Sequence, residues 1–371
     1  MTLLAAGTLV TPFVTLRPGW IAIEDGRVQE LGEGRPPAVA DFDLGDRAVV
    51  PGFVDVHCHG GGAADYAVDG AAAASFHLRN GTTTTFASLV TAPLELLVEQ
   101  LRQLHELAAD GVIAGIHLEG PFLGARRRGA HDPTLLRNPA PELLDLLIGA
   151  ARGSLRMVTL APELAGGLAA IRRLRERGIV PAVGHTDASY AQTLEAVDAG
   201  AAVATHLFNG MRPLHHREPG PALALLEAPG VICELILDGV HVHEALVRHV
   251  VRAAGTDRIA LVSDAISAAG MGDGTFELGG RSVIVENGVA RLDGSLAGST
   301  LTLARAVQLA VNALGLPFAD AVRMATATPA RALGLDGTGE LAPGRPADLV
   351  VLGEGLDVAG VMRQGRWLVE P

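Results

Sequence analysis

The feature that most constrains this chain is a repeated alternation of short apolar runs and helical stretches between residues 51 and 265. Most runs are followed by an alanine- and leucine-rich stretch with helical spacing, such as residues 93–109 and 164–177. Near-continuous hydrophobicity is typical of parallel strands that are covered on both faces. The eight runs end at His59, Leu89, Glu119, Pro162, His185, His206, Asp238 and Asp264. Eight strand–helix units predict an α/β fold, a (β/α)8 TIM barrel.

A doubly wound open sheet is the alternative architecture. It is weaker, because no G-x-G-x-x-G turn follows the first apolar run. One barrel with a small appendage also accounts for the whole length of 371 residues.

The two ends of the chain have a different pattern. Residues 20–23 and 28–31 read as strands around the hairpin dipeptide Asp25-Gly26, and short strands and turns return after Leu335. Each end alone has too few strands to bury a core. We therefore expect a small β-sandwich domain built from both chain termini.

This pattern predicts the following domain organisation. Residues 1–50 and 335–371 form the small β domain, and residues 51–334 form the catalytic barrel. A β-hairpin is inserted near 273–294, because residues 275–292 alternate in polarity and turn at Asn287-Gly288.

Composition narrows the partners and the compartment. A net charge of −12 argues against a nucleic-acid partner, because binding to phosphate backbones needs a basic face. No stretch is apolar and long enough to span a bilayer, and the start of the chain lacks the basic region of a signal peptide. Cys58 and Cys233 make no disulfide framework. We expect a cytoplasmic protein without a membrane partner.

The chain contains no lysine, so all 29 basic residues are arginine. This excludes a P-loop, a pyridoxal Schiff base and a carboxylated lysine that bridges two metals. Any bridging ligand must be a carboxylate.

Polar side chains at the ends of these apolar runs are the candidates for chemistry, because the active site of a parallel barrel lies at the C-terminal ends of its strands. In a strand, His57 and His59 point the same way, while Cys58 points to the other face and packs as a small hydrophobe. The candidate ligands are His57, His59, Glu119, His185 and His206. Imidazoles with a carboxylate are typical of zinc or ferrous iron.

A single histidine at a strand end is more often structural than a ligand. Four of them beside Glu119 and Asp264 favour a metal, because a barrel mouth would otherwise bury charge at a cost of several kcal/mol. His117 precedes Glu119 by two residues, so it either points into the barrel or has a structural role beside the ligands. The histidines in or near predicted helices are interpreted as surface or packing residues, namely His77, His105, His243 and His249.

Longer motifs surround these residues. They are HLEGPF around Glu119, GHTDA around His185, THLFNGM around His206, VSDA around Asp264, GAHDP around His131, HHREPG around Arg217, DGVHV around His241, LAGST at 296–300, and TATPARALGL followed by GxLxPGxPADLVVL. Together they resemble the amidohydrolase superfamily, in particular its N-acetylglucosamine-6-phosphate deacetylase family. The resemblance spans nearly the whole chain and includes an intact H-x-H pair.

The resemblance implies a metal-dependent enzyme that removes the acetyl group of N-acetylglucosamine 6-phosphate. The cofactor would be one or two divalent ions, most consistent with zinc or iron, with Glu119 as the bridge. Asp264 would be the catalytic acid–base, taking a proton from water and returning it to the leaving amine. His131 and His241 would hold or polarise the carbonyl and hydroxyl groups of the substrate.

The resemblance also implies a phosphate site and a dimer. Arg217 with His216, aided by Asn209 and Gly210, is the expected phosphate cluster, and part of it would serve the partner subunit of a homodimer. Leu296, Ala297 and Gly298 are expected to close over the sugar. The run of arginines at 126–128 is either a second phosphate site or, as charge runs usually are, a solvated face.

Two other functions stay open at this point. Another amidohydrolase acting on a cyclic amide or related N-acyl sugar would share the metal but not the sugar-phosphate loops. An inactive barrel scaffold would show gaps in the ligand set, and the sequence shows none.

Overall fold

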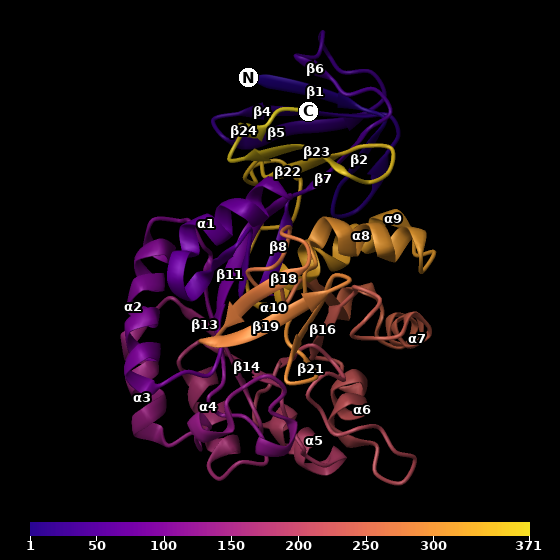
Figure 1. Cartoon of the computed structure of the whole chain (residues 1–371). Helices are drawn as coiled ribbons and strands as arrows, with labels where there is room; N and C mark the ends of the chain where they lie inside the picture. Colours follow the sequence, from indigo (N-terminus) through magenta and orange to yellow (C-terminus); the bar gives the residue numbers. More distant parts are fainter.

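Eight parallel strands form the centre of the computed structural model, which describes residues 1–371 (Figure 1). They are β8 (Phe53–Cys58), β11 (Thr82–Leu89), β12 (Gly115–Glu119), β13 (Leu155–Leu160), β14 (Val180–Val183), β15 (Val203–Ala204), β16 (Ile232–Ile236) and β17 (Ile259–Val262). Each strand pairs with the next in chain order. Beside the two edge strands, the Asp264 N–H donates to the His57 carbonyl oxygen at 2.9 Å. The predicted TIM barrel is confirmed.

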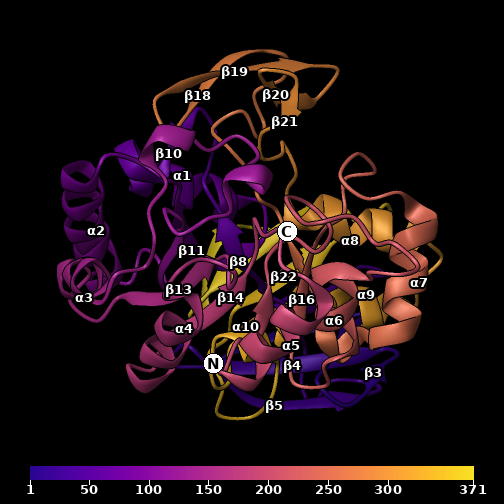
Figure 2. The same cartoon turned by 90° about the horizontal axis from the view of Figure 1, so that it is seen from below.

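Helices surround these strands (Figure 2). They are α1 (Tyr66–Arg79), α2 (Leu94–Ala109), α3 (Pro141–Ala150), α4 (Gly167–Glu176), α5 (Tyr190–Asp198), α6 (Gly220–Glu227), α7 (Glu244–Ala254), α8 (Leu303–Asn312), α9 (Phe318–Met324) and α10 (Ala327–Ala332). Helix α2 buries Leu97, Leu101 and Leu104, which share one helical face. Helix α5 begins with a capping box between Ser189 and Gln192. None of the helices has both the length and the apolar character of a transmembrane span.

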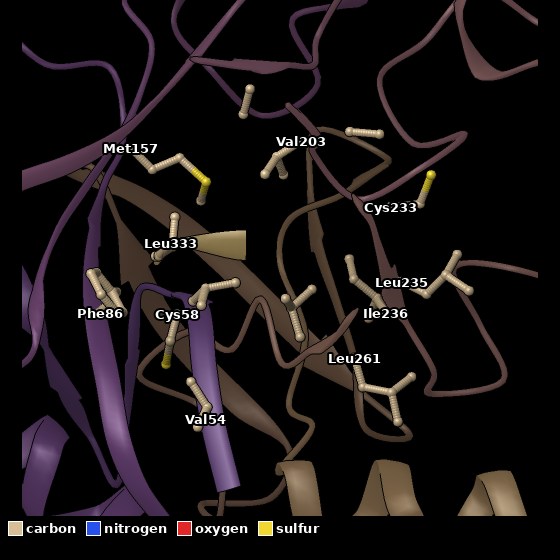
Figure 3. Close-up of a cluster of buried hydrophobic side chains, with 14 of the residues drawn as sticks. Val54, Cys58, Phe86, Met157, Val203, Cys233, Leu235, Ile236, Leu261 and Leu333 are labelled. Atoms are coloured by element: carbon tan, nitrogen blue, oxygen red, sulfur yellow. The ribbon is translucent and has the colours of Figure 1, made fainter. Parts of the chain in front are cut away.

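Apolar side chains of the strands and helices pack together in the buried core (Figure 3). Val54, Phe86 and Met157 belong to one cluster of 74 buried residues that joins strands and helices. Such a core holds the strand ends in fixed positions, which a site assembled from several strands needs.

The first apolar run contains two strands rather than one. Val49 and Val50 belong to β7 (Ala48–Pro51), and β8 begins only at Phe53. Between them, a Cβ atom on Gly52 would lie 2.0 Å from Thr83 Oγ1, so this close approach requires glycine.

Two further sheets are formed by residues near the chain ends. Their strands are β1 (Thr2–Ala6), β2 (Thr8–Val10), β3 (Thr15–Leu16), β4 (Gly19–Glu24), β5 (Arg27–Glu33), β6 (Phe42–Asp43), β7, β22 (Leu349–Leu352), β23 (Val358–Arg363) and β24 (Arg366–Val369). The sheet orders are β5-β4-β1-β6 and β24-β23-β22-β7-β2-β3. Antiparallel pairing of β7 with β22 joins the two ends of the chain, and 13 buried residues form a core of their own.

The insertion after the last barrel strand is a four-stranded antiparallel sheet, larger than the expected hairpin. It contains β18 (Gly274–Leu278), β19 (Arg281–Glu286), β20 (Val289–Leu292) and β21 (Ser295–Leu296). The turn at Asn287 and Gly288 has positive φ at both residues, 53° and 74°, as a two-residue hairpin turn requires. The prediction of one hairpin missed the break between β18 and β19 and the two-residue strand β21.

Candidate metal centre

A cavity of about 300 Å³ lies where the barrel strands end. Most of the expected site residues line it, namely His59, Glu119, His131, His185, His206, Asn209, Gly210, His241, Asp264, Leu296, Ala297 and Gly298. His57 lies fully buried against this group. His216 and Arg217 are exposed and do not line the cavity.

Three of these side chains belong to residues with left-handed backbone conformations. His185, His206 and Asp264 each follow the last residue of a strand by two positions, with φ of 47°, 29° and 46°. Non-glycine residues seldom adopt positive φ, and such strain is concentrated at functional sites. Their direction therefore comes from the turn after the strand and not from strand alternation.

Hydrogen bonds donated by Nδ1 fix the orientation of three imidazoles. Nδ1 of His57 donates to Glu234 Oε2 at 3.0 Å, Nδ1 of His59 to the Ser88 carbonyl at 3.1 Å, and Nδ1 of His185 to the Arg127 carbonyl at 2.8 Å. Because these oxygens only accept, each Nδ1 carries a proton and a neutral ring presents its Nε2 lone pair to the cavity.

Glu119 lies among these Nε2 atoms. Its Oε1 is 3.1 Å from His185 Nε2 and 2.9 Å from His206 Nε2, and its Oε2 is 3.4 Å from His59 Nε2. Asp264 Oδ1 lies 3.1 Å from His59 Nε2 and 3.6 Å from His57 Nε2. Glu119 therefore contacts both histidines of the first strand and the two histidines that follow β14 and β15.

The site electrostatically favours positive charge. Burial alone would lower the pKa of His59, but Asp264 and Glu119 outweigh burial and raise it to about 9. Burial would raise the pKa of Asp264, but His57 and His59 lower it to about 2. Converging imidazole and carboxylate donors thus fit a divalent cation, and the donor set suits zinc or iron.

His131 has the opposite hydrogen-bond arrangement. The Thr91 N–H donates to its Nδ1 at 3.3 Å, so the proton of the neutral ring is on Nε2, 3.5 Å from Glu119 Oε2. Burial lowers the pKa of His131 to about 4, which keeps the ring neutral. A neutral ring with Nε2–H is suited to donating a hydrogen bond to a substrate oxygen.

His241 is held by Asp238. Its Nδ1 donates to Asp238 Oδ2 at 2.6 Å. Burial would lower the pKa of His241, but Asp238 outweighs burial and raises it. His241 thus presents Nε2 to the cavity as a hydrogen-bonding group.

Glu234 is the main site residue that the sequence interpretation missed. It is fully buried on β16, and its Oε2 also accepts from the His206 backbone N–H at 3.1 Å. The sequence signal is a carboxylate in the middle of the apolar run VICELILD. A prediction limited to strand ends misses Glu234, because it lies within β16, two residues before the strand ends.

Glu234→Gln is expected to weaken metal binding by about 10–100-fold, the usual cost of losing a partner that orients a ligand. Glutamine keeps the shape but removes the charge that fixes the His57 tautomer. Competition with a chelator measures the affinity, and Glu286→Gln on the exposed insertion is the matched control. Equal affinity in all three proteins would contradict this role.

The other residues considered from the sequence lie outside the candidate ligand cluster. His117 is buried between Ser88 Oγ and Thr159 Oγ1, contacts that favour a structural role. His77 is buried, lying 2.8 Å from the Gly60 carbonyl and 3.1 Å from Cys58 Sγ. In the arginine run, Arg127 pairs with Asp187 at 2.8 Å, while the side chain of Arg126 is 84% exposed.

A TIM barrel with such a donor cluster at its strand ends defines a class of metal-dependent hydrolases. Residues 48–368 match the model of the amidohydrolase family. The chain belongs to this family and groups with its N-acetylglucosamine-6-phosphate deacetylases.

Individual relatives support this placement. The chain is 38% identical to an N-acetylgalactosamine-6-phosphate deacetylase of Escherichia coli O157:H7, covering 94% of this chain and 95% of that protein. It is 32% identical to an N-acetylglucosamine-6-phosphate deacetylase of Lysinibacillus sphaericus, covering 94% and 92%. A variant of the Mycobacterium smegmatis N-acetyl-D-glucosamine-6-phosphate deacetylase, solved with N-acetyl-D-glucosamine-6-phosphate, matches with TM-score 0.97 at 49% identity, covering 100% and 99%. These relatives confirm an amide hydrolase rather than an inactive scaffold.

Proposed function

We propose that this protein hydrolyses N-acetylglucosamine 6-phosphate to glucosamine 6-phosphate and acetate. One observation carries the proposal. In a chain that matches such deacetylases over nearly its whole length, Asp264 lies in the substrate-sized cavity within 3.1 Å of a candidate ligand, His59.

The side chains have distinct roles in this reaction. A divalent ion held by Glu119, His185 and His206 would act as a Lewis acid, polarising the amide carbonyl and lowering the pKa of water. Asp264 accepts the proton of the attacking water and transfers it to the leaving nitrogen. His131 donates from Nε2 to the carbonyl oxygen, and His241 holds a sugar hydroxyl.

The same geometry bears on the number of ions. His57 and His59 offer two further nitrogen donors near Glu119, at 3.7 Å from its Oε1 and 3.4 Å from its Oε2. We propose that one or two ions bind, zinc or iron, with Glu119 as the bridge where two are bound. Metal analysis of protein purified without added metal tests the stoichiometry.

We further propose a homodimer in which His216 and Arg217 complete the phosphate site of the partner subunit. These residues are exposed outside the cavity of their own chain, whereas Asn209 and Gly210 line it. Leu296, Ala297 and Gly298 cover the sugar. Two buried free cysteines fit the reducing cytoplasm.

A deacetylation assay tests this function. Acetate release is compared for N-acetylglucosamine 6-phosphate, its galactosamine counterpart and unphosphorylated N-acetylglucosamine. The galactosamine compound is a second candidate substrate, because the relative from Escherichia coli O157:H7 is named for it. If metal-loaded protein releases acetate from neither phosphorylated sugar, the proposal is rejected.

Arg217→Ala is expected to lower kcat/KM for the phosphorylated substrate by about 10–100-fold, the cost of one charge-assisted hydrogen bond. Activity on the unphosphorylated sugar should stay unchanged, as should both activities in the surface control Arg248→Ala. Mixing Arg217→Ala with Asp264→Asn subunits should restore activity if the loop serves the partner. An equal loss with and without phosphate would contradict the assignment.

A further inference from the structure

A second cavity, of about 630 Å³, adjoins the candidate active site. Its walls come from the start of α1, the start of α2 and strand β18, and half of its lining residues are hydrophobic, including Val68, Leu96 and Phe276. Of the candidate metal ligands, only His59 borders this space, and the sugar-phosphate groups of the proposed reaction do not use it.

Four residues line both cavities, namely His59, Val90, Leu278 and Gly279. Val90 follows β11, and Leu278, which is 8% exposed, ends β18 and belongs to the apolar core against which Val90 packs. Gly279 has φ of +58°, and a Cβ atom there would lie 2.7 Å from Val90 Cγ2. The partition between the two cavities is thus formed by Gly279 and by the side chains of Val90, Leu278 and His59.

Barrel geometry places this partition opposite the proposed phosphate end. Asn209 and Gly210 follow β15, the sixth barrel strand, and Val90 follows β11, the second. Strands two and six of an eight-stranded barrel lie across from each other. In a hexosamine 6-phosphate, the carbon that carries the nitrogen is likewise across the ring from the carbon that carries the phosphate arm. The acyl group therefore faces Val90 and Leu278.

We propose that Val90 and Leu278 form the end wall of the acyl site and restrict hydrolysis to short N-acyl groups. The proposal rests on the proposed deacetylase function. The cavity behind the wall provides space for uncharged acyl chains of three or four carbons once the wall is trimmed. Its lining also contains Asp65, Asp69 and Glu277, so a chain that ends in a carboxylate is disfavoured there.

The test compares kcat/KM for the N-acetyl, N-butyryl and N-malonyl derivatives of glucosamine 6-phosphate. One extra methylene in an apolar pocket usually changes kcat/KM by about 10–200-fold, so the unaltered enzyme should strongly prefer acetyl. In Leu278→Ala, the butyryl-to-acetyl ratio of kcat/KM should rise by about tenfold or more. The malonyl derivative, of similar length but anionic, should not gain.

Leu292→Ala is the matched control, because Leu292 is buried in the same core but lines neither cavity. Val90→Ala trims the other half of the wall and keeps the test decisive if Leu278→Ala does not fold. Unchanged butyryl-to-acetyl ratios in folded Leu278→Ala or Val90→Ala would overturn the inference, as would an equal rise in Leu292→Ala. Failure of the unaltered enzyme to release acetate would instead reject the proposed function.

Discussion

Asp264→Asn is expected to reduce turnover by about 100- to 10,000-fold while bound metal stays largely unchanged. Asparagine keeps the shape of the side chain but cannot accept the proton from water. The distance of 3.1 Å between Asp264 Oδ1 and His59 Nε2 also allows a role as a ligand, so the metal measurement decides between the two roles. The assay is kcat with acetate detection, combined with metal content of the same sample.

Asp46→Asn is the control for this substitution, because Asp46 is exposed in the region of the small sheets. Turnover and metal content should equal those of the unaltered protein. Loss of metal in Asp264→Asn would show that Asp264 acts primarily as a ligand. Full turnover with metal retained would remove it from the chemistry.

Glu119→Gln is expected to lose most of the bound metal and nearly all activity. Loss of a residue that only orients a ligand already weakens metal binding by about 10–100-fold, so loss of the central carboxylate should exceed that range. The buried imidazoles of His57, His59, His185 and His206 would also lose the negative charge that they surround. Metal content after dialysis and acetate release measure the two effects.

Glu195→Gln on the exposed face of α5 is the matched control and should retain both metal and activity. Thermal unfolding of each protein in chelator separates loss of metal from loss of fold. If Glu119→Gln keeps its metal after dialysis, Glu119 is neither a required ligand nor a bridge.

The two substitutions separate two functions that share one cavity. Asp264 is expected to move a proton, whereas Glu119 is expected to hold the ion. A barrel mouth can support both, because the two carboxylates come from the ends of different strands. Both lie near His57 and His59, but of the two only Glu119 also contacts His185 and His206. Loss of Glu119 should therefore lower metal content, whereas loss of Asp264 should lower turnover with metal retained.

Parts of the fold were predictable because they depend on local patterns. Apolar runs of strand length, each followed by a helical stretch, gave the eight units of the barrel in their order. The split of the first run and the division of the insertion into four strands were not predictable, since both depend on which strand each segment pairs with. Val49, for example, pairs with Val351 from the far end of the chain.

The candidate site shows the same division. The strand-end positions of His59, Glu119 and Asp264 follow from the sequence, because a polar residue that ends a buried strand must face the mouth or be costly to bury. Glu234 was missed because its own segment does not show whether a carboxylate there has a hydrogen-bonding partner. Without a partner, the same carboxylate would argue against a buried strand. Its partner is 177 residues away, at His57.

The sequence by itself determined the barrel, the set of side chains that reach its mouth and, through the absence of lysine, a carboxylate as the only available bridge. Only the tertiary structure decided which imidazole nitrogens carry protons, which distinguishes His131 from the candidate ligands. It also placed His216 and Arg217 outside their own cavity and Val90 against Leu278. The physical reason is that hydrophobic periodicity acts over a few residues, whereas hydrogen-bond partners and cavity walls come from segments that only the folded chain brings together.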